Sequence, residues 1–96
     1  MRLGRGEETI CDYPKDTWLG WNTEQRGAAA EVYVMAYSIL AFIIQLAQYQ
    51  YTEAETVCDY PVETWNLFSP SQREGAASMY AIAYGNNKLI KELSQS

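Results

Sequence analysis

Nine polar or aromatic positions that could take part in binding or catalysis occur twice in this chain, always 47 residues apart. The first set is Thr9, Cys11, Asp12, Tyr13, Thr17, Gln25, Arg26, Tyr33 and Tyr37. The second set is Thr56, Cys58, Asp59, Tyr60, Thr64, Gln72, Arg73, Tyr80 and Tyr84. An arginine beside aromatic rings could hold an anionic ligand with a flat ring, such as a nucleotide. The sequence therefore offers one candidate ligand site in each half, or one site shared between them.

A structural role explains the same residues equally directly. Asp12 and Asp59 would accept backbone N–H groups at helix starts, and the two arginines would pair with acids of the D-Y-P segments. Because a fold built twice must hold its corner together twice, we favour this interpretation. The residues that we retain as candidates for binding a ligand or partner are Arg26, Arg73, Tyr33, Tyr80, Trp18, Trp65, Glu53, Glu55 and Glu63.

Catalysis has little support in the sequence. The chain has no histidine, so neither a Ser-His nor a Cys-His couple can be assembled. Asp12 and Asp59 could meet as a carboxylate dyad, although both are better explained as helix caps. A structural zinc site needs four nitrogen or sulfur ligands, and the sequence supplies two cysteines. We therefore expect a protein that is not an enzyme and that uses no metal or cofactor.

The two cysteines, Cys11 and Cys58, occupy equivalent positions. The stretch from Met1 to Ile10 is too polar for a secretory signal, so we expect a cytoplasmic, reducing environment with two buried free thiols. A Cys11–Cys58 disulfide remains the alternative, because equivalent residues near an internal axis can approach each other.

The duplicated residues belong to a longer repeat. Residues 8–48 align without a gap with residues 55–95, and 18 of the 41 aligned positions are identical. A chain of 96 residues has room for one hydrophobic core, and a unit of this size rarely hides its apolar face alone. We therefore predict a single domain, residues 1–96, in which repeats 8–48 and 55–95 pack about a pseudo-twofold axis.

Capping signals predict where the long helices begin. Asn22 and Ser69 are each followed three residues later by glutamine, the pattern of a capping box. From these caps we predict long helices over Thr23 to Tyr51 and over Pro70 to Tyr84 or beyond. A short helix after each D-Y-P segment would be wedged against the long helix by Trp18 and Trp65 with their aromatic neighbours.

The predicted fold class is thus all-α: a tandem duplication, at an offset of 47, of a short helix plus a long helix. Each long helix carries a heptad-like stripe, which starts at Arg26 in the first repeat and at Arg73 in the second. Alanines in both stripes would allow the helices to approach closely. We expect the two stripes to form the internal seam.

The first long helix is apolar on every face around Ile39 to Leu46, whereas the equivalent part of the second repeat is polar. A small domain cannot surround such a helix with its own residues, so we predict a homodimer through Ile39, Leu40, Phe42 and Ile43. A membrane span over Ala28 to Leu46 is a less favoured alternative, because the window contains Glu31 and Gln45.

The net charge of −5 falls entirely between Arg26 and Arg73, a stretch with five acids and no lysine or arginine. Binding to a nucleic-acid duplex requires a basic stripe, so this distribution argues against it. The acidity suits a basic protein surface, although it also serves solubility alone.

From small size, acidity and tyrosine content we predict a non-enzymatic protein-binding module, such as a regulator or inhibitor of a host protein carried by a phage or mobile element. Its contact surface would be the acidic connector, Glu53 to Glu63, with the aromatic side chains of Tyr49, Tyr51, Tyr60 and Trp65. The alternative is a protein that binds or sequesters an anionic, nucleotide-like small molecule through Arg26 and Arg73. An oligomeric membrane protein ranks third.

Overall fold

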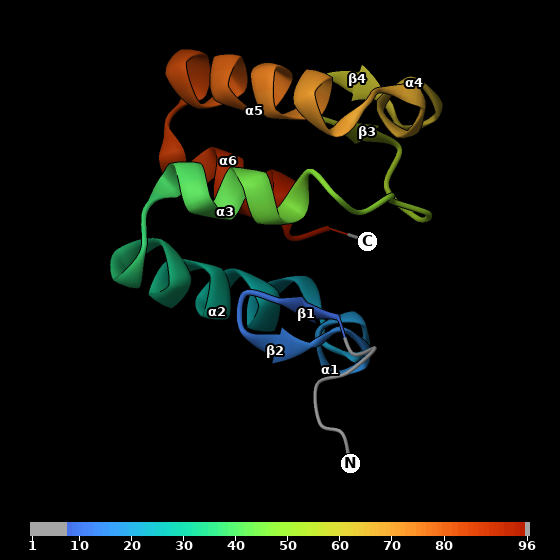
Figure 1. Ribbon diagram of the computed structural model, residues 1–96. Coiled ribbons are helices and arrows are strands. Elements are labelled where there is room, and N and C mark those ends of the chain that lie inside the picture. The colour runs from blue at the N-terminus through green and yellow to red at the C-terminus, as the bar shows by residue number, and fades with distance from the viewer. Residues whose placement is uncertain (1–7, 96) are drawn as a thin grey trace.

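Each repeat opens with a small hairpin that runs directly into a short helix (Figure 1). The computed structural model describes residues 8–95, so residues 1–7 of the segment considered as a secretory signal lie outside the described range. The first hairpin and helix are β1 (Thr9–Ile10), β2 (Tyr13–Pro14) and α1 (Lys15–Gly20). The second are β3 (Thr56–Val57), β4 (Tyr60–Pro61) and α4 (Val62–Leu67).

The hairpins turn through two residues that both have positive φ angles. Cys11 and Asp12 have φ values of 54° and 73°, and Cys58 and Asp59 have 51° and 72°. Positive φ at both central residues is the requirement of a type I′ turn, which normally selects Asn-Gly. A Cys-Asp pair gives no such signal, so the hairpins were not predicted, and the all-α class is only approximate for residues 8–95.

The long segments that follow the corners are each divided into two helices. These are α2 (Thr23–Ala36) and α3 (Ile39–Leu46) in the first repeat, and α5 (Pro70–Tyr84) and α6 (Asn86–Leu93) in the second. Both predicted capping boxes are confirmed: Asn22 and Gln25 exchange hydrogen bonds of 2.8 and 3.0 Å, and Ser69 and Gln72 exchange bonds of 3.2 and 2.8 Å.

The prediction of one helix from Thr23 to Tyr51 is wrong. The chain leaves the helix at Tyr37 and Ser38, and the Ser38 hydroxyl accepts the N–H of Ala41 at 2.9 Å to start α3. The break lets α3 fold back across the molecule, which buries its apolar face in the chain's own core. Helix propensity alone predicts a continuous helix here, and tertiary packing overrides it.

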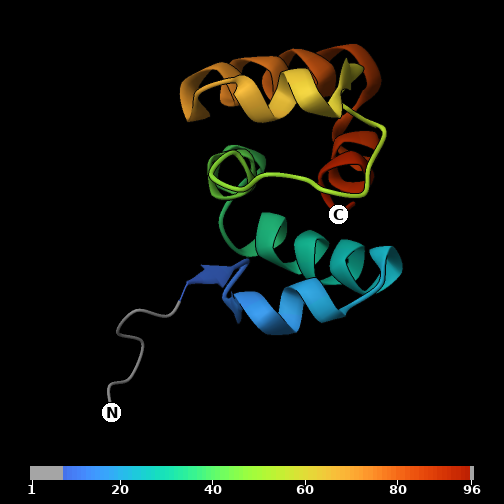
Figure 2. The same cartoon turned by 90° about the vertical axis from the view of Figure 1, so that its right-hand side faces the viewer.

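Helices α2 and α5 form the two outer layers, and α3 and α6 lie between them (Figures 1 and 2). Helix α3 packs against α2 and also against α5, and α6 packs against α5 and also against α2. The predicted direct seam between the two long helices is therefore wrong, because the second helix of each repeat occupies that space. Each repeat contributes its last helix to the other repeat's packing.

The predicted dimer surface needs correction for the same reason. Phe42 and Ile43 are 0 % and 2 % exposed, since they form part of the chain's own core, and Ile39 is half-buried against it. Leu40, at 54 % exposure, is the most exposed of the four predicted interface residues. Phe42 and Ile43 are thus unavailable to a second copy, while dimer formation itself stays a prediction.

No helix in residues 8–95 combines the length and the hydrophobicity that crossing a bilayer requires. The window considered for a span, Ala28 to Leu46, is interrupted by the break at Tyr37 and Ser38.

Gly85 supplies the break between α5 and α6, with φ of 105° and ψ of 159°, a region that is accessible almost only to glycine. Gly85→Ala should lower the free energy of unfolding by about 1–3 kcal/mol through backbone strain. A steric clash would add nothing to this cost, because a Cβ at this position meets nothing within 4 Å. Gly27→Ala, inside α2, is the matched control and should raise it by about 0.5–1 kcal/mol. Urea unfolding would measure both, and equal effects of the two substitutions would contradict the assignment.

Candidate functional site

Arg26, the first candidate residue, holds three separate pieces of chain together. Its Nε donates to the carbonyl oxygen of Trp18 at 2.9 Å, and Nη2 donates to the carbonyl of Leu19 at 3.0 Å. Both carbonyls belong to the last turn of α1. Its Nη1 reaches the carbonyl of Ser94, directly after α6, at 3.1 Å. The side chain therefore joins the first repeat's corner to the end of the second repeat.

Arg73 makes the matching contacts from the second repeat. Its Nε donates to Trp65 at 3.0 Å and its Nη2 to Asn66 at 2.9 Å, both carbonyls at the end of α4. Its Nη1 donates to the carbonyl of Ala47, directly after α3, at 2.7 Å. Ala47 and Ser94 are equivalent positions, 47 residues apart. The two arginines thus clasp the repeats reciprocally.

The two guanidinium groups are buried, with residue exposures of 4 % and 5 % for Arg26 and Arg73. Carbonyl oxygens at helix C-termini carry partial negative charge, so they solvate a buried cation through charge-assisted hydrogen bonds. We expected the D-Y-P acids as partners, and that expectation is wrong: Asp12 instead accepts a hydrogen bond of 2.9 Å from the Tyr37 hydroxyl. The structural interpretation of the arginines is the one that fits these contacts.

The aspartates and tyrosines of the duplicated set form one cluster in each repeat. The Asp12–Tyr37 bond has its counterpart in the hydrogen bond between Tyr84 and Asp59, which raises the pKa of Tyr84. Tyr33 and Tyr80 stack beside these tyrosines at ring distances of 4.6 Å in both repeats. The hairpins that carry Asp12 and Asp59 lie on opposite outer layers (Figures 1 and 2), so the two carboxylates form no dyad.

The candidate tryptophans are core residues. Trp18 and Trp65 are 2 % and 0 % exposed, and they pack on Trp21 and Phe68 at ring distances of 6.2 and 6.3 Å. The indole N–H of Trp65 has no hydrogen-bond partner among residues 8–95. These contacts hold the short helices in place, so Trp65 presents no surface to a partner.

Both cysteines are buried and free, as expected, and they form no disulfide. Burial, together with the nearby charge of Asp12, raises the pKa of the Cys11 thiol to about 12. Burial, with Glu92 and Asp59, raises the pKa of Cys58 to about 12 as well. A thiol with such a pKa stays protonated at neutral pH and is a poor nucleophile.

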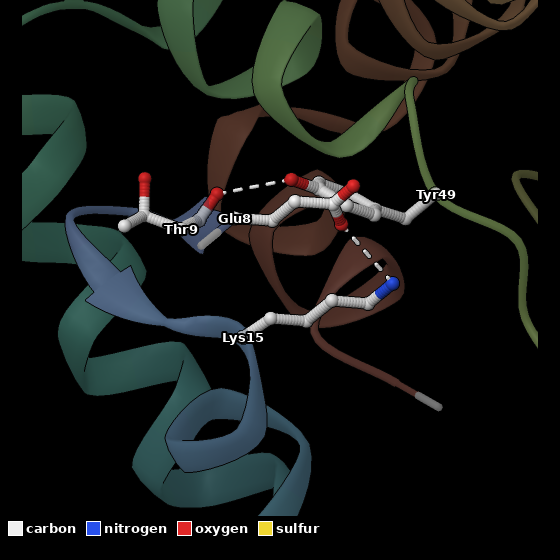
Figure 3. A network of polar contacts seen from close by, with 4 residues as sticks. All are labelled: Glu8, Thr9, Lys15 and Tyr49. Atoms are coloured by element: carbon white, nitrogen blue, oxygen red, sulfur yellow. Dashed lines mark hydrogen bonds and ion pairs between the residues drawn. The ribbon is translucent and has the colours of Figure 1, made fainter. Parts of the chain in front are cut away.

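A groove of about 700 Å³ lies between the first hairpin and the segment after α3. At its rim the Lys15 ammonium lies 3.3 Å from the Glu8 carboxylate and 5.2 Å from the centre of the Tyr49 ring (Figure 3). The Tyr49 hydroxyl donates to the carbonyl of Thr9 at 3.0 Å. Four amides also line the groove: Gln45, Gln48, Gln50 and Gln95.

Neither arginine lines this groove, and neither do Tyr33 and Tyr80. The described charges along it are the paired Lys15 and Glu8. An anionic, nucleotide-like ligand would find no uncommitted cation there, so the groove does not provide the predicted arginine site.

The acidic connector, Glu53 to Glu63, begins just after a fixed residue, Tyr51, and contains both buried and exposed positions. Tyr51 is 4 % exposed, and its hydroxyl donates to the carbonyl of Leu93 at 2.7 Å. The Asn66 side chain bonds the backbone N–H and carbonyl of Tyr51 at 3.0 and 2.8 Å. The connector carboxylates that stay exposed are Glu53, Glu55, Asp59 and Glu63. Of its predicted aromatic neighbours Tyr60 is 40 % exposed and Tyr49 is half-buried, whereas Tyr51 and Trp65 are buried.

The sequence reasoning missed a set of exposed apolar side chains on the outer helices. Val32 and Met35 on α2 are 66 % and 85 % exposed, and Met79 and Ile82 on α5 are 66 % and 79 % exposed. Their positions are equivalent in the two repeats, and in each helix they are three residues apart. These apolar positions lie outside the stripe of residues that the two long helices share, and their helical spacing is the signal in the sequence that indicates a second apolar face.

Loss of the guanidinium should destabilise the fold before it affects any binding. Arg73→Gln leaves buried carbonyls of Trp65, Asn66 and Ala47 without a charged donor, so the free energy of unfolding should fall by about 2 kcal/mol or more. Lys91→Gln, at an exposed position of α6, is the control and should change it little. Urea unfolding is the measurement. An unchanged unfolding midpoint for Arg73→Gln would return this residue to the list of ligand candidates.

Glu92 provides a pH-dependent contribution that the first repeat lacks. Burial raises the pKa of its carboxyl above the ordinary 4.5, although the hydrogen bond from the Cys58 N–H, at 2.8 Å, opposes the rise. The folded chain therefore holds this proton more tightly than the unfolded chain. The resulting stabilisation is complete below the ordinary pKa and is lost as the pH rises through the folded pKa.

Glu92→Gln places at this position the residue type of the equivalent Gln45. The substitution should remove the loss of stability that Glu92 causes as the pH rises. The variant should become more stable relative to the unsubstituted protein as the pH rises from about 4 to 7. Urea unfolding at several pH values would show this, with the exposed substitution Glu63→Gln as control. Parallel pH profiles for Glu92→Gln and the unsubstituted protein would rule out the assigned role.

Comparisons with known proteins add no relative to these observations. No family model matches the chain, and neither a curated protein nor a solved structure matches it. What the protein does is therefore inferred from its own surface, charge and contacts.

Proposed function

We propose that this protein is a small, non-enzymatic module that binds a protein partner through a basic surface of that partner. The observation that carries the proposal is the distribution of exposed charge. Within residues 8–95 nine carboxylates are exposed, whereas the exposed cations are Lys88 and Lys91. Because Arg26 and Arg73 are buried, their charges do little to offset the acidity at the surface.

The module is built, on this proposal, from a tandem duplication of residues 8–48 and 55–95 packed about a pseudo-twofold axis. Support comes from the order of elements, which is hairpin, short helix and two further helices in both segments. The reciprocal contacts of Arg26 with Ser94 and of Arg73 with Ala47 also relate equivalent positions. A symmetric module of this kind suits the binding of symmetric or repeated partners.

The finer assignment is a cytoplasmic regulator or inhibitor of a host protein, of the type that phages and mobile elements carry. Its contact surface is the acidic connector, with Glu53, Glu55 and Glu63 and the exposed edge of Tyr60. Exposed carboxylates steer a basic partner toward this surface, and a tyrosine ring adds apolar contact. The small-molecule alternative is weaker, since its two arginines donate to backbone carbonyls.

Charge reversal in the connector should weaken partner capture. Glu55→Lys with Glu63→Lys, and the triple variant that adds Glu53→Lys, should each retain less partner in affinity capture followed by mass spectrometry, most strongly at low salt. The matched control is Glu8→Lys with Asp16→Lys, which makes the same charge change at the equivalent positions of the first repeat. Equal loss in test and control variants would mean that overall charge, and not the connector, attracts the partner.

A further inference from the structure

The outer helices α2 and α5 carry matching apolar strips that face solvent. On α2 the strip is Ala28, Val32 and Met35, and on α5 it is the equivalent set Gly75, Met79 and Ile82. The four larger side chains are all at least 66 % exposed. Residues spaced by four and then three lie along one face of a helix, so each strip is continuous.

Packing within the chain does not account for these side chains. The buried residues of α2 are Arg26 and Ala30, and those of α5 are Arg73 and Ala77. Single exposed apolar residues are common on protein surfaces and need no explanation. Here, however, the larger strip residues differ between the repeats, Val32 against Met79 and Met35 against Ile82, while their apolar character is the same.

The shape of each strip suits close approach by another helix. Ala28 and Gly75 stand one turn before the larger side chains, and a Cβ added at Gly75 would meet nothing within 4 Å. Small residues at a helix crossing let two backbones come close, and the larger residues then fill the grooves of the incoming helix. An amphipathic helix laid along the strip is the binding mode that this surface fits.

Charge decides which kind of helix would bind there. Glu24 and Glu31 are exposed on α2, and Glu74 is half-buried on α5. The basic residues of these two helices, Arg26 and Arg73, are both buried. A second copy of this chain would place acids against acids, whereas a partner with lysine or arginine beside its apolar residues complements both strips.

The strips lie on the two outer layers, with α3 and α6 between them (Figures 1 and 2). We propose that α2 and α5 are two equivalent docking faces, each for a basic amphipathic helix, so that one chain holds two partner helices. This inference rests on the proposed function and adds to it the location, the chemistry and the number of the partner contacts.

A synthetic amphipathic peptide tests the proposal without knowledge of the natural partner. The probe has about 14 residues, the length of α2, with leucines on one face and flanking lysines. Isothermal titration calorimetry should give two peptides per chain. Val32→Ser with Met35→Ser, and separately Met79→Ser with Ile82→Ser, should each reduce this to one, and the four substitutions together should abolish binding.

Salt and a control variant sharpen the test. The affinity of the α2 face should fall more steeply with salt, because Glu24 and Glu31 are replaced on α5 by Ser71 and Ser78. Leu67→Ser, at a position that is 86 % exposed but outside both strips, should leave two peptides bound. Circular dichroism melts of every variant verify that the fold is retained.

Three results would overturn the inference. The first is no peptide binding, or binding of one peptide that neither serine pair affects. The second is concentration-dependent self-association of the chain in sedimentation velocity that the serine substitutions abolish, since a second copy would then occupy the strips. The third is peptide binding that survives the serine variants but is lost with Glu55→Lys and Glu63→Lys; the proposed function would then stand and the docking faces would not.

Discussion

The fold depends on two buried guanidinium groups that are held by backbone carbonyls. Arg26 and Arg73 each close the end of a short helix in their own repeat and the end of the last helix in the other. A buried cation without partners is costly, and helix C-termini leave carbonyls that need donors. Each arginine meets both requirements at once. Each arginine also donates to one carbonyl of the other repeat, so these hydrogen bonds join the two halves.

This arrangement also determines how the chain ends its long helices. The carbonyls that the arginines take from the other repeat, at Ala47 and Ser94, lie directly after α3 and α6. Those helices reach that place because the chain breaks before them, at Tyr37 and Ser38 and at Gly85. The break in the first repeat uses a serine hydroxyl as a cap, and the break in the second uses a glycine with positive φ. Two different local solutions therefore give the same path of the chain.

Local signals in the sequence were sufficient for the starts of α2 and α5 and for the end of α5 at Tyr84, before Gly85, but not for the end of α2 at Ala36. The capping boxes at Asn22 and Ser69 involve residues three apart, so their pattern is visible in sequence. The hairpins were hidden because Cys-Asp lacks the glycine that usually marks such a turn. The break after Ala36 depends on packing of α3 against α5, residues far apart in the chain, and no local pattern reports it. The arginines were recognised as important, but whether their partners were carboxylates, carbonyls or a ligand depended on the tertiary fold.

Comparison of the two repeats separates residues that the fold explains from residues that it does not. Arg26 and Trp18 are identical to their equivalents Arg73 and Trp65, and the burial and contacts of these residues account for that identity. The apolar strips on α2 and α5 are different in residue type, exposed, and without a contact in the core that would require them. A fold constrains the residues that it buries, whereas a binding surface constrains character and shape. On the proposal of two docking faces, the shared hydrophobicity of Val32 and Met79, and of Met35 and Ile82, serves binding. The hydrogen bonds of the shared arginines to backbone carbonyls serve the fold.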